Sequence, residues 1–178
     1  MSVRSELLDA GRRLCEKHRL SEIGAVEICR NAQLVQAAFE TQFTDFDDYL
    51  IALQQQFMTE LRDAIVAATL SLPAGLPRFR AGAAAYLEGC LERRALRNWL
   101  VEARMRPRVF EGLLKQNQTY LVLLGLEFAA FGAAHPPAAA RLFLAMLNEA
   151  ALLEQVAGRA QAEVREMLWD FLASVAAN

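Results

Sequence analysis

The chain has 178 residues, of which 54% are hydrophobic, and its 19 basic and 21 acidic side chains give a formal net charge of -2. This composition excludes a disordered chain, and it gives no overall electrostatic attraction to nucleic acid or to an acidic membrane. The three cysteines, Cys15, Cys29 and Cys90, are widely spaced and odd in number, which indicates buried free thiols in a reducing compartment rather than a disulfide framework.

The periodicity of apolar residues predicts helices along nearly the whole chain. An amphipathic first helix presents one apolar face, formed by Val3, Leu7, Leu8, Gly11, Leu14 and Cys15. After a break at 19–24, two short helices are expected over 25–31 and 35–42, with a tight turn at 32–34 between them. A long helix then begins after Asp45, its predicted N-cap, and ends at Leu72-Pro73-Ala74-Gly75.

The second half of the chain predicts a bundle of longer helices. They are expected over about 78–92, 95–104, 108–131, 136–158 and 161–175, with prolines and glycines at the breaks. No alternation typical of a strand, no internal repeat and no low-complexity tract is visible. We therefore predict an all-α fold of about nine helices, with a small N-terminal domain over 1–45 and a larger helical domain over 46–178.

No segment of the sequence predicts a membrane protein. The first six residues lack the apolar core of a signal peptide, and no apolar run reaches the roughly 18 to 20 residues that a membrane-spanning helix needs. The expectation is a soluble, cytoplasmic protein with no membrane partner.

The N-terminal part of the sequence shows a pattern known from a protein family: three short predicted helices lead into a long fourth. The first of them contains Leu8-Asp9-Ala10 and Leu14. This pattern resembles the N-terminal domain of TetR-type transcriptional regulators. The match covers the packing positions Ile28, Ala32, Phe39, Phe43 and Leu50, and conservatively Cys29, Leu34 and Tyr49. The resemblance implies a helix-turn-helix that binds double-stranded DNA, with these candidate contacts: Gln33, Val35, Gln36, Ala37, Ala38, Thr41 and Gln42.

The departures from the family pattern lie at turn, cap and phosphate-contact positions. Gln33 stands where the family usually has the turn glycine, which predicts a strained or altered turn. Gly24 replaces the usual threonine before the second helix, so a side-chain cap is lost. Glu40 and Phe46 stand where the family commonly has a tyrosine and a lysine for the DNA backbone.

Charge around the expected reading helix opposes strong binding to DNA. From Gln33 to Leu50 there are four acids, Glu40, Asp45, Asp47 and Asp48, and no base. Cations that displace counterions from phosphates supply most of the non-specific affinity for DNA. Three of the acids also have a structural explanation, since Asp45 can cap a helix whose first turn then holds two more acids. Basic residues elsewhere in the first 50 positions are a second possible source of contacts: Arg4, Arg12, Arg13, Lys17, Arg19 and Arg30.

The resemblance also implies a dimer and an effector site in the larger domain. The last two helices are expected to pair with those of a second copy, and the apolar stripe available for this is Val164, Met167, Leu168, Phe171, Leu172 and Val175, unless it is only internal core. A small hydrophobic or anionic effector is expected among the middle helices. The candidate ligand-binding residues, each also compatible with ordinary core, are Phe57, Leu61, Tyr86, Cys90, Trp99, Met105, Phe110, Tyr120, Leu124 and Phe128.

One basic segment stands out in this acidic chain. Eight arginines and only three glutamates lie between Arg78 and Arg108. Arginine suits bidentate recognition of carboxylate or phosphate, so the segment can face an anionic effector, an acidic protein or the acidic N-terminal domain itself. The plainer alternative is a solvated helix face with local ion pairs.

No pattern typical of an enzyme is present, and neither a metal site nor a cofactor is expected. The sequence lacks a glycine-rich phosphate loop, His-Glu-x-x-His and Cys-x-x-Cys, and its two histidines, His18 and His135, fall at predicted helix ends. We expect a homodimeric TetR-like regulator whose DNA binding is modulated by an effector. The alternative is a TetR-like protein that has lost independent DNA binding and acts through protein contacts.

Overall fold

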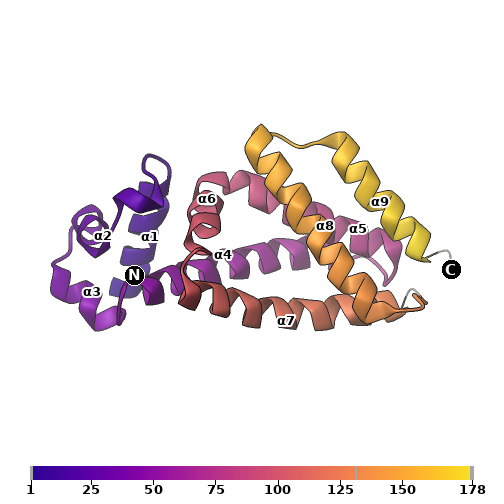
Figure 1. Cartoon of the computed structure of the whole chain (residues 1–178), viewed down its shortest axis with the longest axis horizontal. Helices are drawn as coiled ribbons and strands as arrows, with labels where there is room; N and C mark the ends of the chain where they lie inside the picture. The colour runs from indigo at the N-terminus through magenta and orange to yellow at the C-terminus, as the bar shows by residue number, and fades with distance from the viewer. Residues whose placement is uncertain (1, 131, 177–178) are drawn as a thin grey trace. The chain divides into compact units, whose positions relative to one another are not determined.

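A computed structural model describes residues 2–130 and 132–176 of the chain, and within them every regular element is helical (Figure 1). The all-α prediction is confirmed. The elements are α1 (Val3–Cys15), η1 (Leu20–Glu22), α2 (Ala25–Ala32), α3 (Gln36–Gln42), α4 (Phe46–Thr69), α5 (Leu76–Glu92), α6 (Arg94–Ala103), α7 (Pro107–Ala130), α8 (Pro136–Ala157) and α9 (Ala162–Ala176).

The predicted helices agree with these bounds to within two residues, except that α4 ends at Thr69, three residues before the predicted stop at 72–75. The 3₁₀ turn η1 is an addition, because three residues are too few to show a period in the sequence. The expected last residue of α7, Phe131, lies outside the described residues.

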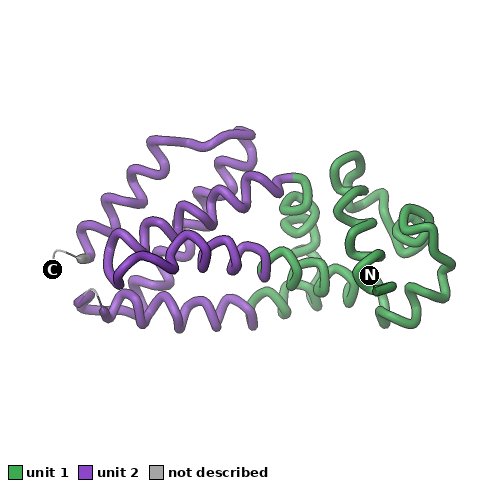
Figure 2. Tube along the Cα trace, turned by 180° about the vertical axis from the view of Figure 1, so that it is seen from behind, with its two compact units in different colours: residues 1–58, 95–114 green, residues 59–94, 115–178 purple. Residues whose placement is uncertain are grey.

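The chain forms two compact units that do not coincide with the predicted domains (Figure 2). Unit 1 contains residues 1–58 and 95–114, and unit 2 contains 59–94 and 115–178. The expected boundary at 45/46 falls immediately before α4, whereas the division into compact units passes through α4 and assigns α6 to the N-terminal helices. One reason lies in Trp99 on α6, which is 2% exposed and donates a hydrogen bond from Nε1 to the His18 carbonyl at 2.8 Å.

Aromatic side chains form the centre of unit 1. Phe39, Phe43 and Tyr49 are at most 3% exposed, and their ring centroids lie 5.1 to 5.5 Å apart. Such tilted and edge-on pairs stabilise a core beyond the area they bury. Most of the positions that match the family pattern are buried here, including Ile28 and Leu50 at 0% exposure. The pattern therefore identified the core of a three-helix unit.

A second aromatic cluster holds unit 2 together. Phe79 on α5, Phe128 on α7 and Phe143 on α8 have ring centroids 5.0 to 5.9 Å apart, and Phe171 on α9 stacks on Phe143 at 6.3 Å. Leu168 and Leu172 of α9 are also buried. Most of the apolar stripe of α9 thus packs inside the unit.

The cysteines agree with the predicted buried thiols, since Cys15, Cys29 and Cys90 are all free and buried. Burial raises the pKa of the Cys15 thiol to about 11, with the nearby Glu16 carboxylate as a smaller cause.

Within the described residues no helix is long and apolar enough to span a membrane.

The turn between α2 and α3 has the strain that the sequence predicts. Gln33 adopts φ 59° and ψ 36°, and among the described residues it is the one non-glycine residue with a positive φ. Its backbone N–H donates to the Arg30 carbonyl, and the Leu34 N–H donates to the Cys29 carbonyl at 2.9 Å. These bonds close the end of α2 in the left-handed geometry that favours glycine.

Replacing Gln33 with glycine is expected to raise the free energy of unfolding by about 1 kcal/mol, because a left-handed backbone costs an L-residue roughly 1–2 kcal/mol and glycine recovers part of it. Urea denaturation followed by circular dichroism measures the change. Gln33→Ala is the matched control, since alanine removes the same side chain but keeps the strain. Equal stability of the two variants would show that the turn is unstrained.

Candidate nucleic-acid interface

A hydrogen bond between Gly24 and Glu27 caps the start of α2, the helix that precedes α3. Gly24 precedes α2 and contributes no side-chain cap, as expected, but its N–H donates to Oε2 of Glu27 at 2.9 Å. Hydrogen bonds from the N–H groups of Glu27 and Gly24 lower the pKa of the Glu27 carboxyl. The helix thus keeps one reciprocal capping bond although the expected threonine is missing.

The candidate DNA contacts lie on a largely exposed surface of α3 and of the turn before it. Exposed positions include Gln33, Gln36, Ala37 and Thr41, together with Val35 at 72% exposure, whereas Ala38 and Gln42 are half-buried. Gln36 donates to Glu40 at 2.9 Å, one helical turn on, and the Thr41 hydroxyl donates to the Ala38 carbonyl at 2.8 Å. The surface offers amides, a hydroxyl and methyl groups, which suit base edges.

Asp45 and Asp48 cap α4. The Asp48 N–H donates to Oδ1 of Asp45 at 2.8 Å, and the Thr44 N–H donates to Oδ2 of Asp48 at 3.0 Å. The Asp48 N–H bond is the largest cause of the lowered pKa of Asp45, and the Arg108 guanidinium adds to it. The predicted N-cap is therefore confirmed.

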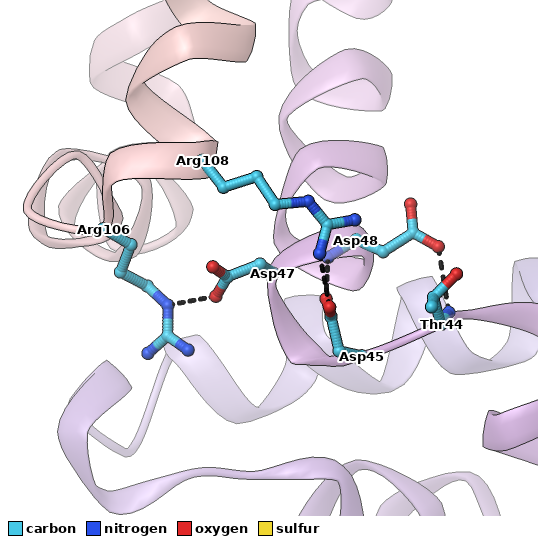
Figure 3. Close-up of polar contacts among 6 residues, drawn as sticks. All are labelled: Thr44, Asp45, Asp47, Asp48, Arg106 and Arg108. Carbon is cyan, nitrogen blue, oxygen red and sulfur yellow. Dashed lines mark hydrogen bonds and ion pairs between the residues drawn. The ribbon is translucent and has the colours of Figure 1, made fainter.

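Two arginines neutralise acids of this segment, as Figure 3 shows. Arg106 Nε contacts Oδ1 of Asp47, and Arg108 Nη1 contacts Oδ2 of Asp45. The Arg106 guanidinium carbon also lies 5.8 Å from the centre of the Phe46 ring. A cation thus occupies the neighbourhood of position 46, where the sequence itself lacks the expected lysine.

These arginines change the charge balance of the unit that contains α3. Residues 1–50 carry six basic and nine acidic side chains, whereas the whole of unit 1 carries ten basic and eleven acidic ones. The net charge of the unit is therefore -1, and repulsion from DNA is weaker than residues 1–50 alone predict.

Part of the basic set near the N-terminus supports the fold. Arg4 donates to the Gln42 carbonyl at 2.8 Å and lies 4.4 Å from the Phe43 ring centre. Arg13 donates to Oδ1 of Asn31 at 2.9 Å. Arg30 is exposed at the end of α2. Arg4 and Arg13 thus hold α3 and α2 in place.

The ten candidate ligand-binding residues are divided between the two units. Unit 1 holds Phe57, Trp99, Met105 and Phe110. Trp99 is committed to the His18 carbonyl, and Met105 and Phe110 are surface residues at 86% and 44% exposure. Met105 and Phe110 are therefore not core residues, and the ligand-binding role of the ten candidates stays a prediction.

The remaining six candidates belong to unit 2. Leu61, Cys90 and Phe128 are at most 1% exposed, while Leu124, Tyr86 and Tyr120 are half-buried. Tyr86 donates from its hydroxyl to Oδ1 of Asn148 at 3.0 Å. Burial raises the pKa of Tyr120.

The basic segment between Arg78 and Arg108 also engages carboxylates outside unit 1. Arg78 pairs with Glu127 at 2.6 Å, and Arg93 pairs with Glu60 at 3.0 Å and with Glu92 at 3.1 Å. Together with the pairs of Arg106 and Arg108, these contacts favour the interpretation that the segment faces acids of its own chain.

No protein-family model matches this chain, and no curated protein does either. Solved structures do match it along nearly its whole length. A transcriptional regulator from Rhodococcus sp. RHA1 superposes with a TM-score of 0.82 at 14% identity, covering 98% of this chain and 96% of the other. A TetR-family transcriptional regulator from Streptomyces coelicolor gives 0.76 at 22% identity, covering 98% and 88%. The chain has the TetR-type fold.

A third structure extends the comparison to another organism. A putative TetR-family regulator from Shewanella sp. PV-4 gives a TM-score of 0.76 at 16% identity, with 98% of both chains covered. In the TetR-type fold of this chain, α2 and α3 form the helix-turn-helix that the sequence predicts.

Within the described residues no group of three or more histidines, cysteines, aspartates or glutamates is placed to hold a metal ion.

Proposed function

We propose that this protein is a homodimeric transcriptional regulator that recognises double-stranded DNA through α3 and responds to a small effector bound in unit 2. The observation that supports DNA recognition best is the exposed surface of α3, whose one charged side chain is Glu40, beside Asp45 and Asp47, which Arg108 and Arg106 neutralise. With no cation on α3 itself, the affinity depends more on base contacts and less on phosphate contacts than in a lysine-rich helix-turn-helix.

Selection of duplexes from a random library, followed by fluorescence anisotropy of the enriched sequence, tests this function. The proposal expects selective binding and a shallow negative slope of log K against log salt. Gln36→Ala should reduce the preference for the enriched sequence, because amides discriminate base edges. An unenriched library would overturn the proposal and favour a protein that acts through other proteins.

The dimer interface that we propose is centred on α8. Leu168 and Leu172 of α9 are buried within the unit, and the exposed side chains of α9 include three acids, Glu163, Glu166 and Asp170. Two α9 helices facing each other would bring these like charges together. The stripe expected to pair across the dimer is thus chiefly internal core, and α8 is the better surface.

One exposed stripe of α8 has the spacing of a helix-packing surface. Leu142, Ala145, Glu149, Leu152 and Val156 follow one another at intervals of three and four, and all are exposed. Such a stripe packs well against a neighbouring helix.

The exposed charges of α8 are self-complementary. They are Arg141 and Glu149, because the third charged residue of α8, Glu154, is buried. A two-fold antiparallel contact centred on Ala145 would set each Arg141 near Glu149 of the other copy.

Reversing one of these charges is expected to weaken the dimer. Arg141→Glu and Glu149→Arg should each raise the dimer dissociation constant roughly tenfold or more, because like charges then meet twice across the axis. The double reversal should restore dimerisation. Sedimentation equilibrium measures the constants, with Arg159→Glu in the same unit as the control. If the double variant dissociates as readily as the singles, the pairing of α8 is wrong.

For the effector we propose an apolar molecule rather than a strongly anionic one. Arg78 and Arg93 of unit 2 are already paired with carboxylates, whereas the candidates Leu61, Leu124 and Phe128 are apolar and lie in the interior or at its edge. A screen of small apolar compounds by thermal shift, repeated with the enriched duplex present, tests this. A true effector binds and lowers the affinity for DNA; compounds that bind with no effect on DNA affinity would contradict the role.

A further inference from the structure

The corner between α6 and α7 is rich in arginine. We define the α6–α7 corner as residues 104–108, which read Arg104-Met105-Arg106-Pro107-Arg108. Met105 is 86% exposed, and the side chains of Arg106 and Arg108 are 44% and 50% exposed. The corner belongs to unit 1, the same compact unit as the helix-turn-helix. It is therefore a basic surface whose position relative to α3 the structure defines.

The two ion pairs place this corner at the beginning of α4. Asp45 and Asp47, which Arg108 and Arg106 contact, follow the last residue of α3, Gln42, by three and five positions. The segment from 33 to 50 contains no base of its own. Arg106 and Arg108 thus bring cations from a distant part of the sequence to the acidic end of the segment 33–50 (Figure 3).

The pairing leaves hydrogen-bond donors on both guanidinium groups. Arg106 contacts Asp47 through Nε and Arg108 contacts Asp45 through Nη1, and a guanidinium has five N–H donors in a fixed fork. The carboxylates hold the arginines in place while half of each side chain remains exposed to solvent. Such a group can bind a phosphate with its terminal nitrogens without loss of the internal pair.

We propose that Arg106 and Arg108 contact the phosphate backbone of DNA beside the bases read by α3. The α6–α7 corner then supplies phosphate contacts that α3 and the start of α4 lack. Asp45 and Asp47 act as positioning residues, which orient the guanidinium groups. This inference rests on the proposed DNA-binding function, and it identifies where the backbone contacts are made.

Salt dependence of DNA binding tests the inference. Arg106→Gln/Arg108→Gln should reduce the magnitude of the slope of log K against log salt by about 3.6, since a bound dimer loses four phosphate contacts and each contributes about 0.9. Affinity at low salt should fall at least tenfold for the enriched and for a scrambled duplex alike, because phosphate contacts do not read sequence. Arg62→Gln/Arg159→Gln, two exposed arginines of unit 2, removes the same charge and should leave the slope unchanged.

An isoelectric variant separates phosphate binding from simple neutralisation of the acids. Asp45→Asn/Asp47→Asn/Arg106→Gln/Arg108→Gln keeps the net charge, and asparagine keeps the N-cap of α4. If the arginines bind phosphate, this variant keeps the reduced slope while circular dichroism shows a folded chain. If it recovers the wild-type slope, the arginines only neutralise Asp45 and Asp47, and the inference is overturned.

Different experimental outcomes would overturn this inference and the proposed function. Selective wild-type binding with an unchanged slope in Arg106→Gln/Arg108→Gln would overturn the corner contact alone. The absence of any enriched duplex would overturn DNA recognition and the corner contact together.

Discussion

Replacing Gly11 with alanine is expected to lower the free energy of unfolding by about 2 kcal/mol. An added Cβ would lie 2.0 Å from Oη and 3.2 Å from Cζ of Tyr49, a side chain with 0% exposure. Overpacking of this kind costs roughly 3 kcal/mol where the neighbour cannot move, and the better helix propensity of alanine returns about 1 kcal/mol. The steric cost therefore exceeds the gain in propensity.

A double-mutant cycle with Tyr49→Phe isolates this contact. Tyr49 donates from its hydroxyl to the Leu7 carbonyl at 3.1 Å, so Tyr49→Phe alone should cost about 1 kcal/mol. In the Tyr49→Phe background the atom nearest to the new methyl is gone, and Gly11→Ala should cost clearly less than in the wild type, although Cζ stays 3.2 Å away. Urea denaturation gives all four stabilities. Additive effects would contradict the close approach of α1 and α4 at this point.

Glu154→Met is expected to destabilise the protein by about 3 kcal/mol, because it leaves the charge of a largely buried arginine without its main partner. Glu154 is 1% exposed, and its two carboxylate oxygens accept bonds from Arg165 at 2.6 and 2.9 Å. The Gln161 N–H donates to the same carboxylate at 3.0 Å, which ties the start of α9 to α8. Glu88 remains 3.5 Å from Arg165 but is itself exposed, so it replaces little of the lost interaction.

The matched control for this prediction removes both charges. Glu154→Met/Arg165→Met should cost less than Glu154→Met alone, since no buried charge is left unpaired. Thermal denaturation of the three proteins gives the order of stability. If the double variant is the least stable, the pair contributes more than its desolvation costs, and the account of this site is wrong.

Acid denaturation should also report this ion pair. Burial opposes ionisation of Glu154 most strongly, but the bonds from Arg165 and Gln161 outweigh it and hold the pKa below its usual range. Because the folded pKa is lower than the unfolded value of about 4.3, the stabilisation is complete above that pH and is lost as the pH falls through the folded pKa. The double variant should lack this part of the acid transition.

The helices and the core of unit 1 could be predicted because local signals agree there with the fold. Asp45 caps α4 as expected, and Phe39, Phe43 and Leu50 are buried at the matched packing positions. The strain at Gln33 was also predictable, since glutamine stands at a turn position where the family has glycine and where the backbone needs a positive φ. These features depend on neighbours within a few residues of each other.

The features that the sequence could not fix depend on contacts between distant segments. Arg106 and Asp47 are 59 residues apart, and Arg108 and Asp45 are 63 apart, so a count of charges over 33–50 misses both arginines. The basic segment suggested an acidic partner within the chain but did not say which arginines would reach it. For the same reason, hydrophobicity alone made Met105 a candidate for the interior of the bundle, although it lies on the surface.

A structure of the full chain bound to its enriched duplex tests the central claim most directly. The account predicts that α3 lies in the major groove with Gln36 at a base edge, and that a guanidinium of Arg106 or Arg108 lies within hydrogen-bond distance of a phosphate oxygen. A complex in which DNA contacts another surface, with α3 exposed to solvent, would contradict it.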